Sequence, residues 1–106
     1  MNEMTTNMRP KRMFMGTPQV DKIQVYKVPS GRSAVLTQVI LSNTDAEDSK
    51  LTITINTIDI MRDYVVGAGE TKVIDLYVVL NEDDTVSLQQ EKANAINVTL
   101  NGLANA

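Results

Sequence analysis

The sequence feature that most constrains the fold is the alternation of apolar and polar residues in short segments. The clearest case is segment 51–57, in which Leu51, Ile53 and Ile55 alternate with threonine and asparagine. Successive side chains of a β-strand point to opposite faces, so this pattern is typical of a strand with one buried and one solvated face. An α-helix would need apolar residues about 3.6 positions apart, and no segment shows that spacing. The chain is therefore expected to fold into β-sheets.

Segments of this type recur roughly every 8–12 residues and are separated by residues that favour turns. We predict strands at 23–28, 34–43, 51–57, 58–66, 72–80, 85–90 and 95–101. Their number and spacing indicate an all-β fold, an antiparallel β-sandwich of about seven strands with jelly-roll or Ig-like connections. The predicted core consists of apolar side chains on one parity of these segments: Leu51, Ile53, Ile55, Ile74, Leu76, Ile96, Val98 and Leu100.

Two of the predicted strands, 34–43 and 72–80, carry apolar residues on both faces. In the second of these, Val73, Tyr77 and Val79 occupy the face opposite the predicted core. Strands of this kind either lie at the centre of a domain or are covered by another subunit. We favour the first interpretation, with both segments as central core strands.

Residues 1–22 show neither the strand period nor the helix period. They hold two of the three prolines and five of the six methionines. A proline pushes the residue before it toward extended geometry. This pattern predicts an extended N-terminal docking arm over residues 1–22, followed by a β-sandwich domain over residues 23–106.

The composition of the arm predicts contact with a partner, because methionine adapts to irregular apolar grooves. Four basic against two acidic residues give segment 1–22 a net charge of +2, whereas the whole chain carries −3. The basic cluster could reach acidic groups of a neighbour, keep the arm soluble or touch DNA, and we favour docking. An acidic body makes nucleic acid an unlikely partner. The candidate partner-docking residues are Met4, Met8, Arg9, Lys11, Arg12, Met13, Phe14 and Met15.

The sequence contains neither histidine nor cysteine, so the usual general base, thiolate nucleophile and zinc ligands are missing. We therefore predict that the protein is not an enzyme and uses no cofactor. Two acidic segments, 45–48 and 82–84, could in principle bind calcium or supply a pair of catalytic carboxylates. They lack the spacing of a calcium loop, and we interpret them as solvated turns. No secretory signal and no apolar run of about 20 residues is present, so no membrane contact is expected.

The order of several short motifs resembles a known family. A strand ending in Tyr-x-Val-Pro-x-Gly at 26–31 is followed by Asn43, then by Gly-Glu-Thr at 69–71. Further signatures are Val79 and Leu80 before Asp84, and Gly102 near the end. Over residues 23–103 the chain resembles the small β-sandwich virion structural proteins of tailed bacteriophages. One departure is that Asp83 stands where that family carries glycine, which predicts a different turn type.

The resemblance implies a bacteriophage virion structural or assembly protein, an accessory component of the neck or tail that is anchored by its N-terminal arm. Its partners would be other virion proteins and further copies of itself, and it would be made in the host bacterial cytoplasm. The alternative within this class is a capsid decoration or head-fibre protein. An alternative of another class is a small carbohydrate-binding β-sandwich module, which would expose aromatic side chains to a sugar. The candidates for that role are Tyr26, Tyr64 and Tyr77, which we interpret as core or interface residues.

Overall fold

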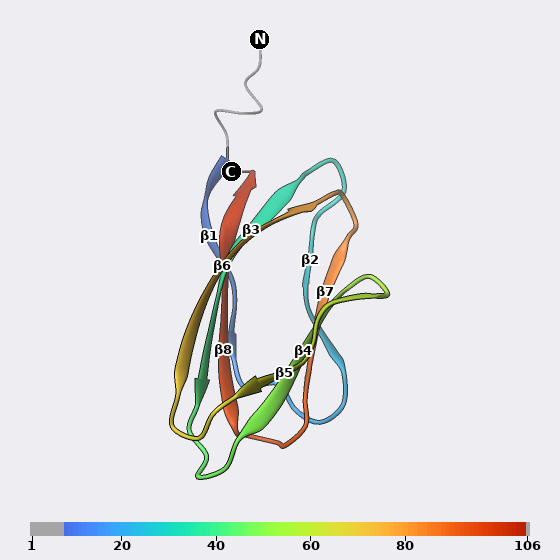
Figure 1. Ribbon diagram of the computed structural model, residues 1–106. Helices are drawn as coiled ribbons and strands as arrows, with labels where there is room; N and C mark the ends of the chain where they lie inside the picture. The colour runs from blue at the N-terminus through green and yellow to red at the C-terminus, as the bar shows by residue number, and fades with distance from the viewer. Residues whose placement is uncertain (1–7, 106) are drawn as a thin grey trace.

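The computed structural model describes residues 8–105 and shows an antiparallel β-sandwich of two four-stranded sheets (Figure 1). None of these residues is helical, and so none belongs to a helix that could cross a membrane. The predicted all-β sandwich is confirmed. The strands are β1 (Met8–Gly16), β2 (Ile23–Lys27), β3 (Ala34–Asn43), β4 (Ser49–Ile55), β5 (Ile58–Val66), β6 (Thr71–Leu80), β7 (Thr85–Gln90) and β8 (Ile96–Asn105).

The strand order is β1-β8-β3-β6 in sheet A and β2-β7-β4-β5 in sheet B. Only β4 and β5 are consecutive strands of the same sheet; every other connection crosses from one sheet to the other. In Figure 1 sheet A lies on the left and sheet B on the right. This order is that of an eight-stranded jelly roll, which decides between the two sandwich types that the sequence left open.

The strand that the sequence pattern missed is β1, which lies inside the predicted arm. It pairs with β8 along its whole length, from Met8 opposite Asn105 to Gly16 opposite Val98. The arm expected over residues 1–22 is therefore not confirmed: residues 8–16 belong to the sandwich, and residues 1–7 lie outside the described residues. The pattern was hidden because the register shifts beside Met13, which breaks the alternation.

The core lies between the two sheets and is built from aliphatic side chains. Six of the eight predicted core residues are buried, whereas Ile74 and Leu76 of edge strand β6 are only partly buried and pack against the core. Each fully buried aliphatic side chain contributes roughly 1.5–3 kcal/mol. The largest fully buried apolar side chains are Leu36, Leu41, Leu51, Ile53, Leu80, Leu88, Ile96 and Leu100.

Sheet A has a line of register shifts across its middle. Shifts occur in β1 between Arg12 and Phe14, and in β3 between Leu36 and Gln38. Gly102 of β8 lies at this line, where an added Cβ would stand 2.1 Å from the Val35 carbonyl oxygen. β-Bulges of this kind bend a strand and strengthen its twist. The backbones approach so closely here that only glycine fits in β8.

Candidate interaction surface

The structure divides the predicted docking residues between the two sides of sheet A. Directly opposed residues of antiparallel strands share a face, so the partners on β8 show where β1 side chains point. Met8, Arg12 and Met15 pair with partly exposed positions of β8 and therefore lie on the outer face of the sheet. These three retain the exposure that a docking role needs.

The other predicted docking residues do not join that face. Arg9 and Lys11 pair with buried positions of β8 and lie on the inner side, at the end of the sandwich. Met13 is buried in the core, and Phe14 packs against it. Met4 lies outside the described residues. Met13 and Phe14 are thus held by the core, and a docking role for the other candidate residues stays a prediction.

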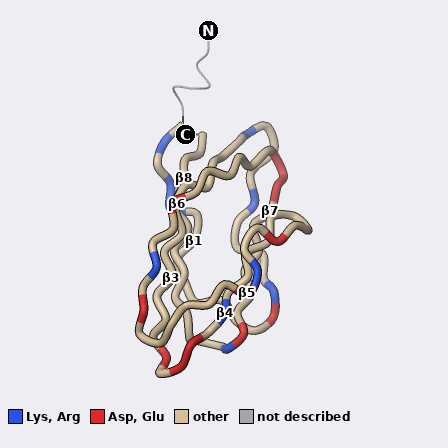
Figure 2. The backbone as a smooth tube through the Cα atoms, viewed as in Figure 1, with Lys and Arg blue, Asp and Glu red and all other residues tan. Residues whose placement is uncertain are grey.

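The outer face of sheet A is largely uncharged. Its two central strands, β3 and β8, contain no charged residue, and Figure 2 shows them without blue or red. The exposed fractions of Met15, Val73, Tyr77 and Val79 lie between 57% and 72%, although these side chains are apolar or aromatic. All four belong to the two edge strands of sheet A. This face is the candidate interaction surface, because several large apolar side chains are left open on it.

The register orders this face into three rows that each cross all four strands. We name them by their β1 residue: the Met15 row, the Arg12 row and the Pro10 row. In sequence across β1, β8, β3 and β6 the rows are Met15, Thr99, Ile40 and Val73; Arg12, Asn101, Gln38 and Asp75; and Pro10, Leu103, Val35 and Val79. A polar row thus separates two mainly apolar rows.

Side-chain hydrogen bonds link three members of the Arg12 row. Asn101 Nδ2 donates to Gln38 Oε1 at 3.1 Å, and Gln38 Nε2 donates to Asp75 Oδ1 at 3.4 Å. Arg12 and Asp75 stand at opposite ends of the row, on the two edge strands. Among the outward positions described for sheet A these are the charged ones, so the face is positive at its β1 edge and negative at its β6 edge.

The three tyrosines differ in exposure. Tyr26 and Tyr64 are partly buried and pack against the core, and burial raises the pKa of the Tyr26 hydroxyl. Tyr77 is 72% exposed and projects from the outer face of sheet A beside the line of register shifts. Within residues 8–105 the tyrosines therefore do not form a shared stacking platform for a sugar.

The outer face of sheet B differs in character from that of sheet A. It carries a polar depression of about 440 Å³ at β4, β5 and β7. Basic, acidic, amide and hydroxyl side chains all contribute to its lining. Its lining includes Lys22, Lys50, Thr52, Asp59, Arg62, Asp63, Gln89 and Glu91. A polar ligand would find hydrogen-bond partners here but no aromatic surface.

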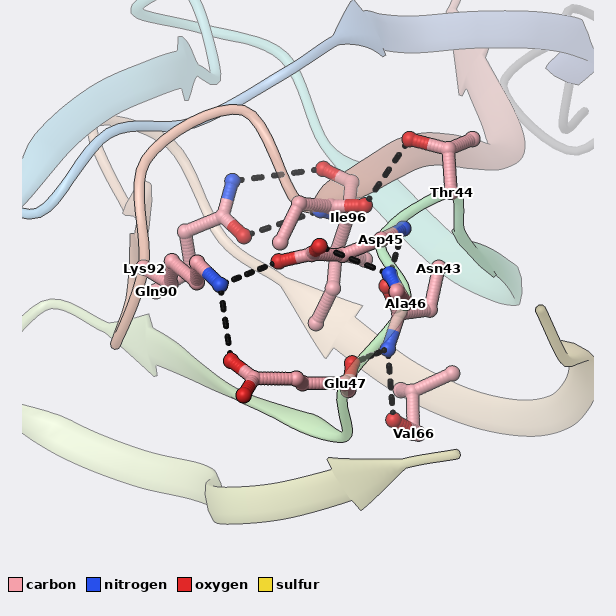
Figure 3. Close-up of polar contacts among 10 residues, drawn as sticks. Asn43, Thr44, Asp45, Ala46, Glu47, Val66, Gln90, Lys92 and Ile96 are labelled. Atoms are coloured by element: carbon pink, nitrogen blue, oxygen red, sulfur yellow. Dashed lines mark hydrogen bonds and ion pairs between the residues drawn. The ribbon is translucent and has the colours of Figure 1, made fainter. Parts of the chain in front are cut away.

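The first acidic segment, 45–48, ties two loops together (Figure 3). Lys92 Nζ lies 2.6 Å from Asp45 Oδ2 and 3.0 Å from Glu47 Oε1. The hydrogen bond from Lys92 lowers the pKa of Asp45, and its acidic partners raise the pKa of Lys92 to about 12. Beneath this pair, Asn43 Nδ2 donates to the carbonyl oxygens of Glu47 and Val66. The carboxylates hold the β3–β4 loop against the β7–β8 loop.

The second acidic segment, 82–84, is used in the same way. Glu82 Oε1 accepts a hydrogen bond from the Gly31 amide at 2.7 Å, and Asp84 Oδ2 accepts one from the Asn81 amide at 2.8 Å. No group of three metal-binding side chains gathers among residues 8–105. Asp83 has a φ of 66°, in the left-handed region that glycine adopts most readily. Asp83 thus adopts a backbone conformation to which glycine is best suited.

Comparison of the sequence with protein-family models and with curated proteins gives no match. The interaction surface therefore rests on the geometry of sheet A. One sequence signal pointed to it, namely the second apolar face of segment 72–80. Segments 34–43 and 72–80 were both predicted to be central strands. This is right for the first, which is β3, and wrong for the second, which is β6, an edge strand of sheet A.

Proposed function

We propose that this chain is a non-enzymatic structural protein that works by binding other protein subunits. More specifically, we propose an accessory component of the neck or tail of a tailed bacteriophage, made in the host bacterial cytoplasm and incorporated into the virion. The observation that carries the proposal is the largely uncharged outer face of sheet A, with Met15, Val73, Tyr77 and Val79 left open. The jelly-roll order, which viral capsid proteins also use, and the family resemblance support it.

The attachment device in this proposal is a sheet face rather than a free arm. Strand β1 contributes Arg12 and Met15 to that face, whereas its Met13 anchors the strand in the core. An edge strand that is held on one side and presents side chains outward can bind a partner without the cost of ordering a flexible segment. Other virion proteins and further copies of this chain are the proposed partners.

Analysis of purified particles tests the proposal directly. Mass spectrometry of virions purified through a density gradient should detect the protein, and quantitative densitometry should give its copy number. A neck or tail ring implies roughly six to twelve copies per particle, whereas a capsid decoration or head-fibre protein implies a much larger copy number. A protein that is abundant in the infected cell yet missing from purified particles would refute a virion role.

A carbohydrate-binding module is the second candidate, and the polar depression on sheet B favours it. The discriminating residue is Arg62 rather than Tyr64, because Tyr64 packs against the core and its loss would disturb the fold. Binding to a glycan array that disappears in Arg62→Ala, while particles lack the protein, would favour this alternative over the virion role.

A further inference from the structure

We propose that the outer face of sheet A is a twofold interface between two copies of this chain. The proposed axis runs parallel to the strands and passes between β8 and β3. The inference rests on the proposed function in one respect, since it names the partner of the same surface. The position and direction of the axis follow from how charge and apolar side chains are arranged in the three rows.

An axis parallel to the strands places β1 of one copy over β6 of the other, and β8 over β3. Each row then meets the same row in reverse order. Met15 lies over Val73 of the second copy, and Pro10 lies over Val79 of the second copy. The exposed apolar side chains of one edge strand are thus covered by those of the other, on both sides of the axis.

Charge selects this axis over the alternative. In the proposed arrangement Arg12 of each copy faces Asp75 of the other, which gives two opposite-charge contacts flanked by apolar rows. An axis across the strands would place Arg12 over Arg12 and Asp75 over Asp75. Like charges brought together at an interface suppress an arrangement. The face is therefore complementary to itself in one orientation and repulsive in the other.

Tyr77 adds a second contact of the same symmetry. It follows Asp75 on the outward side of β6, so in the proposed dimer it reaches the part of β1 between Pro10 and Arg12 of the second copy. A guanidinium over a tyrosine ring, or a proline ring against it, gains from dispersion and cation–π attraction. Large aromatic residues with a charged neighbour are typical centres of interface energy.

The area of the face matches a dimer of modest affinity. Four strands about 4.8 Å apart and nine or ten residues long, which is some 30 Å, give roughly 570 Å² per copy, or about 1,100 Å² in total, when the whole face is buried. This lies just above the roughly 1,000 Å² that a specific interface needs. We expect an equilibrium between monomer and dimer in the isolated protein, with the dimer favoured as concentration rises.

Sedimentation analysis of the isolated chain with charge-reversal variants tests the proposal. The wild-type mass should rise from 11.7 kDa toward twice that value over a concentration series. Arg12→Asp and Asp75→Arg should each raise the dissociation constant at least about tenfold, because each creates two like-charge contacts. The double variant should dimerise again. Mixing the two single variants should give a heterodimer, since every contact is then between opposite charges.

A matched control is Arg62→Asp, an equal charge reversal on the outer face of sheet B, which should leave dimerisation unchanged. Val73→Lys should abolish the dimer although Arg12 and Asp75 are both retained. Circular dichroism should show that each variant keeps its β-sheet spectrum, since all four positions lie on the surface.

Other outcomes overturn the proposal and separate it from the proposed function. A wild-type chain that stays monomeric throughout, or a dimer indifferent to Arg12→Asp, would refute the twofold face. If the monomeric chain still loses incorporation into particles in Arg12→Asp, the face binds a different virion protein. A dimer with the expected variant pattern in a protein missing from virions would uphold this interface and defeat the virion role.

Discussion

At the scale of single residues, the tightest constraint in the molecule is the absence of a side chain at Gly102. The line of register shifts across sheet A brings the Val35 carbonyl and the Met13 side chain against the β8 backbone at this point. Met13 Cε would stand 2.6 Å from an added Cβ, and the Val35 oxygen closer still. A flexible methionine can move aside, but a backbone carbonyl within a paired strand cannot do so cheaply.

We therefore expect Gly102→Ala to destabilise the protein by about 1–3 kcal/mol, the usual cost of forcing extra volume into a packed site. The measurement is the urea midpoint of unfolding followed by circular dichroism. Gly16→Ala is the matched control, because its added Cβ would meet only the movable ring of Phe14, at 2.9 Å. Equal losses in the two variants would show that the close approach at Gly102 is not the limiting contact.

A second prediction at this scale concerns the ion pairs of Lys92. The pKa of Asp45 is lowered from 3.8, so its contribution to stability is complete above that value and disappears as the pH falls through the lowered pKa. The pKa of Lys92 is raised from 10.5 to about 12, so its contribution is complete below 10.5 and disappears as the pH rises through about 12. Lys92→Gln should thus be less stable than wild type between about pH 4 and 10.5, with the difference shrinking toward both extremes.

Urea unfolding at a series of pH values measures that difference. The pair is solvent-exposed, so the gap should be small and should narrow further at high salt. Lys50→Gln serves as the control, since it removes an exposed lysine from the neighbouring strand. A gap between Lys92→Gln and wild type that is constant from acid to alkali would mean that lost packing, and not the ion pair, causes it.

At the scale of elements, β1 joins the core to the surface. Its inner side places Met13 among the buried residues, and its outer side presents Met15 to solvent. Pro10 and the adjacent basic residues lie on an edge strand, where a missing amide donor is tolerated and charge discourages further strand pairing. The features that resembled a flexible arm in the sequence are thus those of a protected edge.

Deletion of residues 1–16 should accordingly prevent cooperative folding. The deletion would remove Met13 from the core and leave a cavity there. It would also expose the core residues that Phe14 covers, and it would leave the β8 edge unpaired. A chain that begins at Met8 is the control and should unfold in a single transition. Thermal and urea unfolding compare the two. If the chain without residues 1–16 unfolds as cooperatively as the control, β1 is dispensable, as the arm prediction required.

The elements also show how far sequence reasoning reaches. The regular alternation of segments such as 51–57 was enough to predict seven of the eight strands and six of the buried core residues. The pattern failed at β1, where a bulge at Met13 breaks the period, and at β6, whose second apolar face was interpreted as central burial. Period-2 patterns report which faces are apolar, but they cannot report what covers them. The strand order and the three rows depend on pairings between residues distant in the chain, which a local pattern does not contain.

At the scale of the whole molecule, the outer faces of the two sheets differ in charge, although both expose apolar side chains, such as Val73 on sheet A and Val65 on sheet B. Sheet A offers a nearly uncharged face with a single polar row, whereas sheet B offers a polar depression lined by both signs of charge. Figure 2 shows charged positions on β5, on the edge strands β1 and β6 and in the loops, whereas β3 and β8 carry none. A subunit built in this way can bury one face in an assembly while the other stays solvated.

This asymmetry predicts that association and stability are linked. If two copies bind through sheet A only when folded, the dimer stabilises the native state, and the thermal midpoint should rise with protein concentration. In Val73→Lys the thermal midpoint should no longer depend on protein concentration. It should match the midpoint of dilute wild type, because Val73 is exposed in the monomer and its replacement costs the monomer fold little. Scanning calorimetry over a hundredfold concentration range is the measurement. Arg62→Asp on sheet B should keep the wild-type slope. A midpoint independent of concentration in the wild type would show that the exposed apolar rows remain solvated in the isolated protein.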